Sequence, residues 1–393
     1  MSIDIEAVRA DTPGVQNVLH LNNAGAALQP QPVLDAVLDH LRLEAEQGGY
    51  EAARLADAAL ENLYHAAARL VGGKPREVAF VENATRAWDM AFYAFDWQAG
   101  DRILTAEAEY ASNYIAYLQV ARKYGVEITV VPSTPEGALD TDALAEAVDD
   151  RVKLIAITHV PTNGGLVNPA AAVGEIAKRH TVPFLLDACQ SVGQMPVDVD
   201  AIGCDMLSVT GRKYLRGPRG TGFLWVRESL IDRLEPPFLD LHAAEWTAPD
   251  RFEMRNDARR FENWECNVAG KIGLGVAIDY ASALGLEAIW ARIQLLADGL
   301  RNLLAALPVV TVRDIGAVQG GIVSFTADGH EPQDLVEALR ARAINVSNSG
   351  RTSTLIDMDA RGLDAVVRAS VHYYNTEEEL DRFQDALADI IGS

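Results

Sequence analysis

The order of hydrophobic and polar positions predicts an α/β protein. Between residues 30 and 230, amphipathic stretches with apolar residues three and four positions apart alternate with short apolar runs bounded by turn residues. The amphipathic stretches predict helices at 32–46, 51–71, 112–124, 141–149 and 168–180. The apolar runs predict buried strands at 102–106, 127–132, 153–158, 182–186 and 205–209. This alternation is typical of a mainly parallel sheet covered by helices on both faces.

The pattern changes near residue 270. A long helical stretch at 271–306 is followed by a mixture of strands and helices typical of a smaller α+β domain. The expected strands are 309–313, 320–326 and 365–373, and the expected helices are 331–343 and 376–391. We therefore expect an N-terminal arm at 1–29, a large α/β domain at 30–270 and a small C-terminal domain at 271–393.

Composition narrows the class of protein. Hydrophobic residues make up 49% of the 393 positions and charged residues 23%, which excludes disordered and collagen-like chains. A net charge of -22 argues against nucleic acid and anionic membranes as partners. Every apolar segment is interrupted before 18 residues, and the start of the chain lacks the apolar core of a signal peptide, so no membrane span is expected. The three cysteines show no paired spacing, which predicts reduced thiols, a cytoplasmic location and no metal site.

An acid and a lysine follow two successive buried strands. Asp187 closes the run FLLD, and Lys213 lies in SVTGRKYLRGPRGTGFLWV, among glycines that permit close backbone approach. Each residue alone is most simply a strand-end acid or a surface lysine. Together they fit pyridoxal phosphate, which needs a lysine to hold its aldehyde and an anion against its pyridine nitrogen.

The lysine segment resembles that of fold type I pyridoxal phosphate enzymes in the aminotransferase class V family. This family includes cysteine desulfurases, isopenicillin N epimerase and ergothioneine-type carbon-sulfur lyases. The resemblance covers nearly the whole chain and implies a large domain with a mainly parallel seven-stranded sheet and a smaller α+β domain. It also implies a homodimer with active sites near the interface.

The resemblance implies a set of cofactor contacts. Lys213 matches the Schiff-base lysine, Asp187 the pyridinium partner and Gln190 the neighbour of the ring hydroxyl. Tyr110, in AEAEYASNY, takes the place of the aromatic residue stacked on the ring and joins Lys213 and Asp187 as a catalytic position. The remaining implied cofactor contacts are Ala84 and Thr85 in the phosphate turn, Thr210, and Arg212 beside the lysine.

The same resemblance implies where the amino-acid substrate binds. Arg368, in VVRASVHYYNT, matches the arginine that forks onto the substrate α-carboxylate. In THVPTNGGLVNP, Thr162 takes the position of the family's substrate-contacting Asn, and Asn163 is adjacent, so either residue could act. Asn23 and Ala24, in LNNAGAALQP, match a turn that lines the substrate site. A structural ion pair at Arg368 and a turn without a ligand at 21–30 are the simpler alternatives.

The sequence leaves the reaction open. Residues 344–364, which precede the Arg368 strand, contain no cysteine, and Cys189 and Cys266 lie elsewhere in the chain, so we expect that the protein is not a Cys-dependent desulfurase. EAEQGGYEAA resembles a segment of the ergothioneine-type lyases and favours β-elimination from a cysteine-derived substrate. ARRFENWECNVAG resembles the family's FExGTxN segment, which often reaches the cofactor phosphate of the partner subunit, but Glu265 stands where the family has threonine. The alternatives are an aminotransferase, an epimerase of the isopenicillin N type and a noncatalytic cofactor-binding scaffold.

Overall fold

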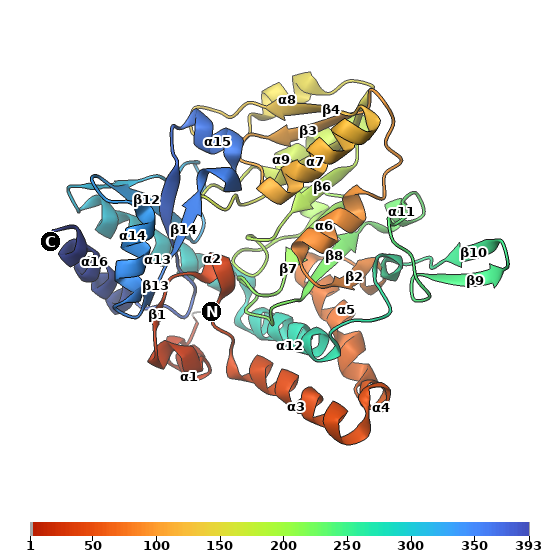
Figure 1. Ribbon diagram of the computed structural model, residues 1–393, viewed down its shortest axis with the longest axis horizontal. Coiled ribbons are helices and arrows are strands. Elements are labelled where there is room, and N and C mark those ends of the chain that lie inside the picture. Colours follow the sequence, from red (N-terminus) through yellow and green to blue (C-terminus); the bar gives the residue numbers. More distant parts are fainter. Residues whose placement is uncertain (1–2, 393) are drawn as a thin grey trace.

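The computed structural model describes residues 3–392 and is built around a seven-stranded sheet (Figure 1). Its order is β2-β8-β7-β6-β5-β3-β4, and only β8 runs antiparallel to its neighbours. The strands are β2 (Val78–Val81), β3 (Arg102–Ala106), β4 (Glu127–Val131), β5 (Val152–Thr158), β6 (Phe184–Asp187), β7 (Met206–Thr210) and β8 (Gly222–Val226). The predicted seven-stranded, mainly parallel α/β fold is confirmed.

Helices cover both faces of this sheet. The helices of this part of the chain are α3 (Gln31–Gln47), α4 (Gly49–Leu55), α5 (Asp57–Val71), α6 (Ala84–Phe92), α7 (Ala111–Tyr124), α8 (Thr141–Ala147), α9 (Ala170–His180), α10 (Val199–Ile202), α11 (Glu228–Ile231) and α12 (Val268–Leu284). Side chains on one face of the sheet pack on α5, α8, α9 and α12, and those on the other face pack on α6 and α7. The chain therefore forms three layers, as its hydrophobic pattern predicts.

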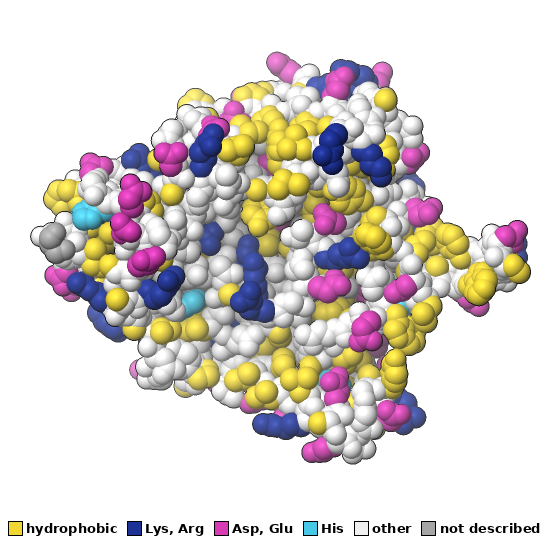
Figure 2. Space-filling view, viewed as in Figure 1, with side chains coloured by type: hydrophobic (Ala, Val, Ile, Leu, Met, Phe, Trp, Pro, Cys, Tyr) yellow, Lys and Arg dark blue, Asp and Glu magenta, His cyan; other side chains and the backbone are white. Residues whose placement is uncertain are grey.

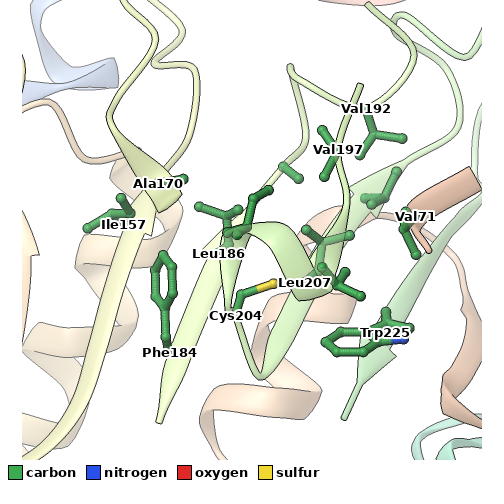
Figure 3. Close-up of a cluster of buried hydrophobic side chains, with 14 of the residues drawn as sticks. Val71, Ile157, Ala170, Phe184, Leu186, Val192, Val197, Cys204, Leu207 and Trp225 are labelled. Atoms are coloured by element: carbon green, nitrogen blue, oxygen red, sulfur yellow. The ribbon is translucent and has the colours of Figure 1, made fainter. Parts of the chain in front are cut away.

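The strands are apolar on both faces because both faces are covered. In β6, Phe184 and Leu186 point into one hydrophobic cluster, whereas Leu185 points into the other, as the two-residue period of a strand requires. Figure 3 shows the first cluster, where Phe184 and Leu186 lie close to Leu207 and Cys204. This packing fixes the ends of β6 and β7, where the candidate site begins.

A second sheet lies in the C-terminal part of the chain. Its order is β11-β12-β15-β14, and it packs on α13, α14 and α16. The elements are α13 (Leu286–Ala305), β11 (Val310–Val312), β12 (Ile322–Ala327), α14 (Pro332–Arg340), β13 (Ile344–Asn345), β14 (Ser347–Gly350), α15 (Leu355–Ala360), β15 (Ala365–Ser370) and α16 (Glu377–Ile391). The N-terminal elements are α1 (Ile5–Ala10), β1 (Leu19–His20), which pairs with β13, and α2 (Asn23–Ala26). The domain division at 29/30 and 270/271 stays a prediction, and residues 1–2 and 393 of the outer domains lie outside the described residues.

Two predicted helices are each divided in the structure. The stretch 51–71 contains α4 and α5, and the stretch 271–306 contains α12 and α13, which meet at an angle of 79°. Gly285 lies between α12 and α13 with φ +87°, a conformation that favours glycine. The hairpin of β9 (Ala244–Ala248) and β10 (Arg251–Met254) was not predicted and projects from the body of the molecule (Figure 1).

Within residues 3–392, no single helix is long and apolar enough to cross a membrane, and only the bent pair α12–α13 meets the length and hydropathy criteria jointly. The same residues contain no group of three or more His, Cys, Asp or Glu side chains arranged to hold a metal ion.

Candidate active site

A cavity of about 490 Å³ lies at the carboxyl ends of the central strands. Figure 2 shows basic side chains gathered near the middle of the corresponding face of the molecule. The cavity brings together nine of the predicted residues, namely Ala84, Thr85, Tyr110, Thr162, Asp187, Gln190, Thr210, Arg212 and Lys213. Asn23, Ala24, Asn163 and Arg368 are not part of its lining. Positions spread over 130 residues of sequence therefore meet at one edge of the sheet.

Asp187 is a buried carboxylate at the end of β6. Its Oδ2 accepts a hydrogen bond from Asn113 Nδ2 at 3.0 Å, and its Oδ1 accepts one from the Cys189 backbone N–H at 2.9 Å. Burial raises the pKa of Asp187, whereas these hydrogen bonds and the charge of Lys213 act in the opposite direction. A buried anion in this position suits a cationic ring nitrogen.

Lys213 lies three residues beyond β7, in the loop that follows Thr210. Its Nζ lies 3.3 Å from Cys189 Sγ, so Cys189 contacts both Lys213 and, through its backbone, Asp187. Desolvation and the nearby Arg212 charge lower the pKa of Lys213, which increases the fraction of neutral amine that can attack an aldehyde. The Lys213 amine, whose pKa is lowered, and the Asp187 carboxylate therefore line the same cavity.

One end of the cavity is suited to a phosphate group. Asn83 caps α6, and its side chain accepts a hydrogen bond from the Arg86 N–H at 2.9 Å. The first turn of α6 presents Ala84 and Thr85 to the cavity, beside Thr210 at the end of β7. Backbone N–H groups at the start of a helix have no partner within the helix and favour anions.

Gln190 supplies an unused acceptor. Its Nε2 donates to the Ala24 carbonyl at 3.2 Å, but its Oε1 is buried without a hydrogen-bond partner in the structure. A buried amide oxygen with no partner is unfavourable unless a donor such as a ring hydroxyl reaches it. Together with Lys213 and Asp187, this acceptor fits pyridoxal phosphate.

Arg368 lies on β15 in the second sheet and reaches towards the cavity from the other side. It donates from Nη1 to the Thr162 carbonyl at 3.0 Å and to the Thr162 hydroxyl, and from Nε to Ser347 Oγ at 3.2 Å. Burial lowers its pKa, and no carboxylate forms an ion pair with it among residues 3–392. A guanidinium with only neutral partners can accept a carboxylate.

The structure separates Thr162 from Asn163. Thr162 lines the cavity, whereas the Asn163 amide donates to Thr354 Oγ1 at 2.9 Å and accepts from Ser349, so it anchors the segment around β14. Asn23 is likewise engaged elsewhere, because its Nδ2 donates to the Ser370 carbonyl at 2.7 Å and its Oδ1 accepts from Tyr374. Ala24 reaches the site only through the carbonyl that Gln190 contacts.

Sequence reasoning missed Asn113, Cys189 and Glu109 as members or neighbours of the site. Asn113 and Cys189 line the cavity, and Glu109 is fully buried behind it. Asn113 lies in the first turn of α7 and Glu109 directly precedes its N-cap residue Tyr110, so the two polar residues flank the start of that helix.

This fold and this arrangement of lysine, carboxylate and helix N-terminus define a fold type I pyridoxal phosphate enzyme. The chain belongs to the aminotransferase class-V family, whose model matches residues 19–383. It is 32% identical over 416 residues to a cysteine desulfurase of Salmonella agona, with 99% of each chain covered. It is similar to the apo structure of a cysteine desulfurase from Thermococcus onnurineus, with a TM-score of 0.92, 29% identity, and coverage of 100% of this chain and 99% of the other. A C-DES mutant with glycine covalently linked to its PLP cofactor shares the fold, with a TM-score of 0.87, 24% identity, and coverage of 97% and 99%.

The expectation that the protein is not a Cys-dependent desulfurase is wrong, because relatives along the full length of the chain are cysteine desulfurases. The expectation rested on the absence of cysteine from residues 344–364 and on the assumption that Cys189 lies elsewhere. The structure instead places Cys189 in the cavity, 3.3 Å from Lys213. Cys189 is far in sequence from residues 344–364, but it lies next to the Lys213 amine in the folded protein.

Proposed function

We propose that this enzyme cleaves the carbon–sulfur bond of cysteine or of a cysteine-derived amino acid. The observation that carries the proposal is the amine of Lys213 and the buried carboxylate of Asp187 in one cavity, joined through Cys189. Full-length relatives named cysteine desulfurases support cysteine as the parent of the substrate.

The side chains have separate tasks in this proposal. Lys213 holds the cofactor and moves the α-proton, since its lowered pKa leaves an amine able to accept one. Asp187 keeps the pyridine nitrogen protonated, and the start of α6 holds the phosphate. When bound, pyridoxal phosphate supplies the electron sink for charge that develops at the α-carbon. Arg368 binds the α-carboxylate at the Thr162 side of the cavity.

Product analysis tests the proposal. The purified chain with pyridoxal phosphate is incubated with L-cysteine, L-cystine and L-alanine, with and without a keto acid and a thiol reductant. We expect sulfur release only from the sulfur amino acids, with alanine as the second product of desulfuration or pyruvate and ammonia as the products of elimination. Keto-acid-dependent amino transfer or inversion of the α-carbon without sulfur release would refute it and would favour the aminotransferase or the epimerase.

The variant Lys213→Ala separates catalysis from scaffolding. It removes the amine and leaves the fold of β7 in place, so all turnover should stop. Turnover that survives in a folded variant would refute Lys213 as the catalytic amine, whereas a folded wild type without turnover on any substrate would favour the noncatalytic scaffold. Thr311→Ala, at an exposed position of β11 in the second sheet, is the matched control and should retain full activity.

We also propose that the enzyme works as a homodimer. Trp246 and Phe252, on the projecting hairpin β9–β10, expose 79% and 50% of their surface, and Leu241 at its base exposes 71%. Large apolar side chains on a projecting arm are typical of a contact surface. Sedimentation velocity of wild type and of Trp246→Glu tests this, with a shift to monomer expected for the variant. The cytoplasmic location stays a prediction.

A further inference from the structure

A buried carboxylate lies behind the cofactor site and has no assigned task. Glu109 is 3% exposed and receives donors from three elements. Its Oε1 accepts from the Tyr110 N–H at 2.8 Å, from Asn113 Nδ2 at 2.9 Å and from the Thr158 hydroxyl. Its Oε2 lies within hydrogen-bond distance of Thr105 Oγ1 at 3.0 Å and of the Tyr117 hydroxyl at 3.3 Å. A site with this many donors is built for a carboxylate.

The stability of the fold does not require a carboxylate at this buried position. No lysine, arginine or histidine forms an ion pair with Glu109 among residues 3–392, and the titratable groups that face it are Tyr117 and Asp187. Replacing a buried charge by an apolar side chain of similar volume is often neutral or stabilising. A second buried acid close to Asp187 therefore points to a role at the site.

Asn113 joins the two acids. Its side-chain nitrogen donates to Glu109 Oε1 at 2.9 Å and to Asp187 Oδ2 at 3.0 Å. An amide group has two N–H donors, and both are used here, one for each carboxylate. Because Glu109 holds one of them, the other is aimed at Asp187 and the amide cannot flip to present its oxygen.

We infer that Glu109 is a positioning residue that acts through Asn113 to fix the Asp187 carboxylate against the pyridine nitrogen of the cofactor. Asp187 has two oxygens, and the Asn113 amide and the Cys189 N–H each hold one of them, which sets the plane of the carboxylate. When Glu109 is ionised, its negative charge also favours a proton near Asp187, and so strengthens the hold of Asp187 on a protonated ring nitrogen. The inference rests on the cofactor site and not on which bond the enzyme cleaves.

A double-mutant cycle tests this inference without substrate. Full-length wild type, Glu109→Ala, Asn113→Ala and the double variant are freed of cofactor and titrated with pyridoxal phosphate, followed by visible absorbance. We expect each single variant to bind the cofactor about tenfold more weakly, the scale of one charge-assisted hydrogen bond. The double variant should bind no more weakly than Asn113→Ala alone, because both changes break one chain of contacts.

Two further variants keep the inference falsifiable if Glu109→Ala does not fold. Glu109→Gln keeps the shape and removes the charge. At pH 8, where Glu109 is ionised, it should weaken cofactor binding about threefold, and it should shift the pH at which the visible absorbance of the bound cofactor changes. Thr311→Ala, at an exposed position of β11 in the second sheet, leaves every donor to Glu109 in place and should change neither quantity.

Three results would overturn the inference. They are a folded Glu109→Ala with unchanged cofactor affinity, a double variant whose affinity loss is the product of the two single losses, and a Glu109→Gln variant identical to wild type in affinity and pH profile. A failure of the proposed carbon–sulfur cleavage would leave all these binding measurements unaffected, so the two proposals fail separately.

Discussion

The ionisation of Glu109 should make the stability of the protein depend on pH in a defined direction. Burial raises the pKa of Glu109 from its ordinary value of 4.5 to about 7, against the opposing hydrogen bonds from Thr158 and Asn113. Between these two values the folded state binds more protons at this position than the unfolded state. The contribution of the protonated Glu109 carboxyl to the free energy of unfolding is therefore fully present below pH 4.5 and is lost as the pH rises through about 7.

The magnitude follows from the two pKa values. A change from 4.5 to about 7 corresponds to about 3.4 kcal/mol, of which about 2.5 kcal/mol falls between pH 5 and pH 8. The variant Glu109→Gln has no group that titrates at this position. Its free energy of unfolding relative to wild type should therefore rise by about 2.5 kcal/mol as the pH increases from 5 to 8.

Urea unfolding of the full-length chain without cofactor, at unit steps from pH 5 to pH 8, measures this difference. Thr311→Ala is the control, because it lies at an exposed position of β11 in the second sheet and leaves the carboxylate and its donors in place, so its difference from wild type should stay nearly constant with pH. A Glu109→Gln difference that is flat, or that falls as the pH rises, would refute the assignment of a raised pKa to this buried carboxylate.

Three other changes test the structure at separate places. Arg216→Met removes a buried guanidinium that donates to the Leu28 carbonyl, the Tyr373 hydroxyl and Thr12 Oγ1. It should lower the free energy of unfolding, measured in urea, by about 4 kcal/mol, and a loss below about 1 kcal/mol would contradict this prediction. Gly174→Ala places a Cβ 1.8 Å from the Ile202 carbonyl oxygen and should lower the free energy of unfolding by more than about 3 kcal/mol. Gly329→Ala, in open space at φ +80°, is the control and should lower it by about 1 kcal/mol. Equal losses in the two variants would refute the packing of α9 on α10. Arg368→Gln should raise KM for the amino-acid substrate about 30-fold and leave the visible absorbance of bound cofactor unchanged, whereas an unchanged KM would exclude Arg368 as the carboxylate-binding residue.

The sequence predicts the central sheet well because its strands are covered on both faces. Short, largely apolar runs lie where β3, β4, β5, β6 and β7 are found, since each strand contributes side chains to the clusters on the two faces of the sheet. The division of 271–306 falls at Gly285, and apolar residues continue on both sides of it, so the hydrophobic pattern does not reveal the break. The hairpin β9–β10 exposes its large apolar residues, so hydrophobic burial gives no signal for it.

The candidate site follows the same logic. Asp187 and Lys213 were predictable because Asp187 ends one buried strand and Lys213 follows the next by three residues, where side chains gather at the edge of a parallel sheet. The cavity position of Cys189 was not predictable from spacing, since it depends on how the chain turns after β6. Asn163 and Thr162 are adjacent in sequence, and only the structure shows that one lines the cavity and the other anchors the β14 segment.

The contact between Glu109 and Asp187 through Asn113 shows what sheet order adds to sequence. These acids are 78 positions apart, and they meet because β3 and β6 are separated only by β5, which supplies Thr158 to Glu109 and pairs Thr158 with Asp187 in register. A glutamate in the loop before α7 and an asparagine in the first turn of that helix together support the cofactor-binding acid. Glu109 and Asn113 act on the cofactor through Asp187. Substitutions of Glu109 or Asn113 should therefore change the affinity for the cofactor more than they change the reaction that the enzyme catalyses.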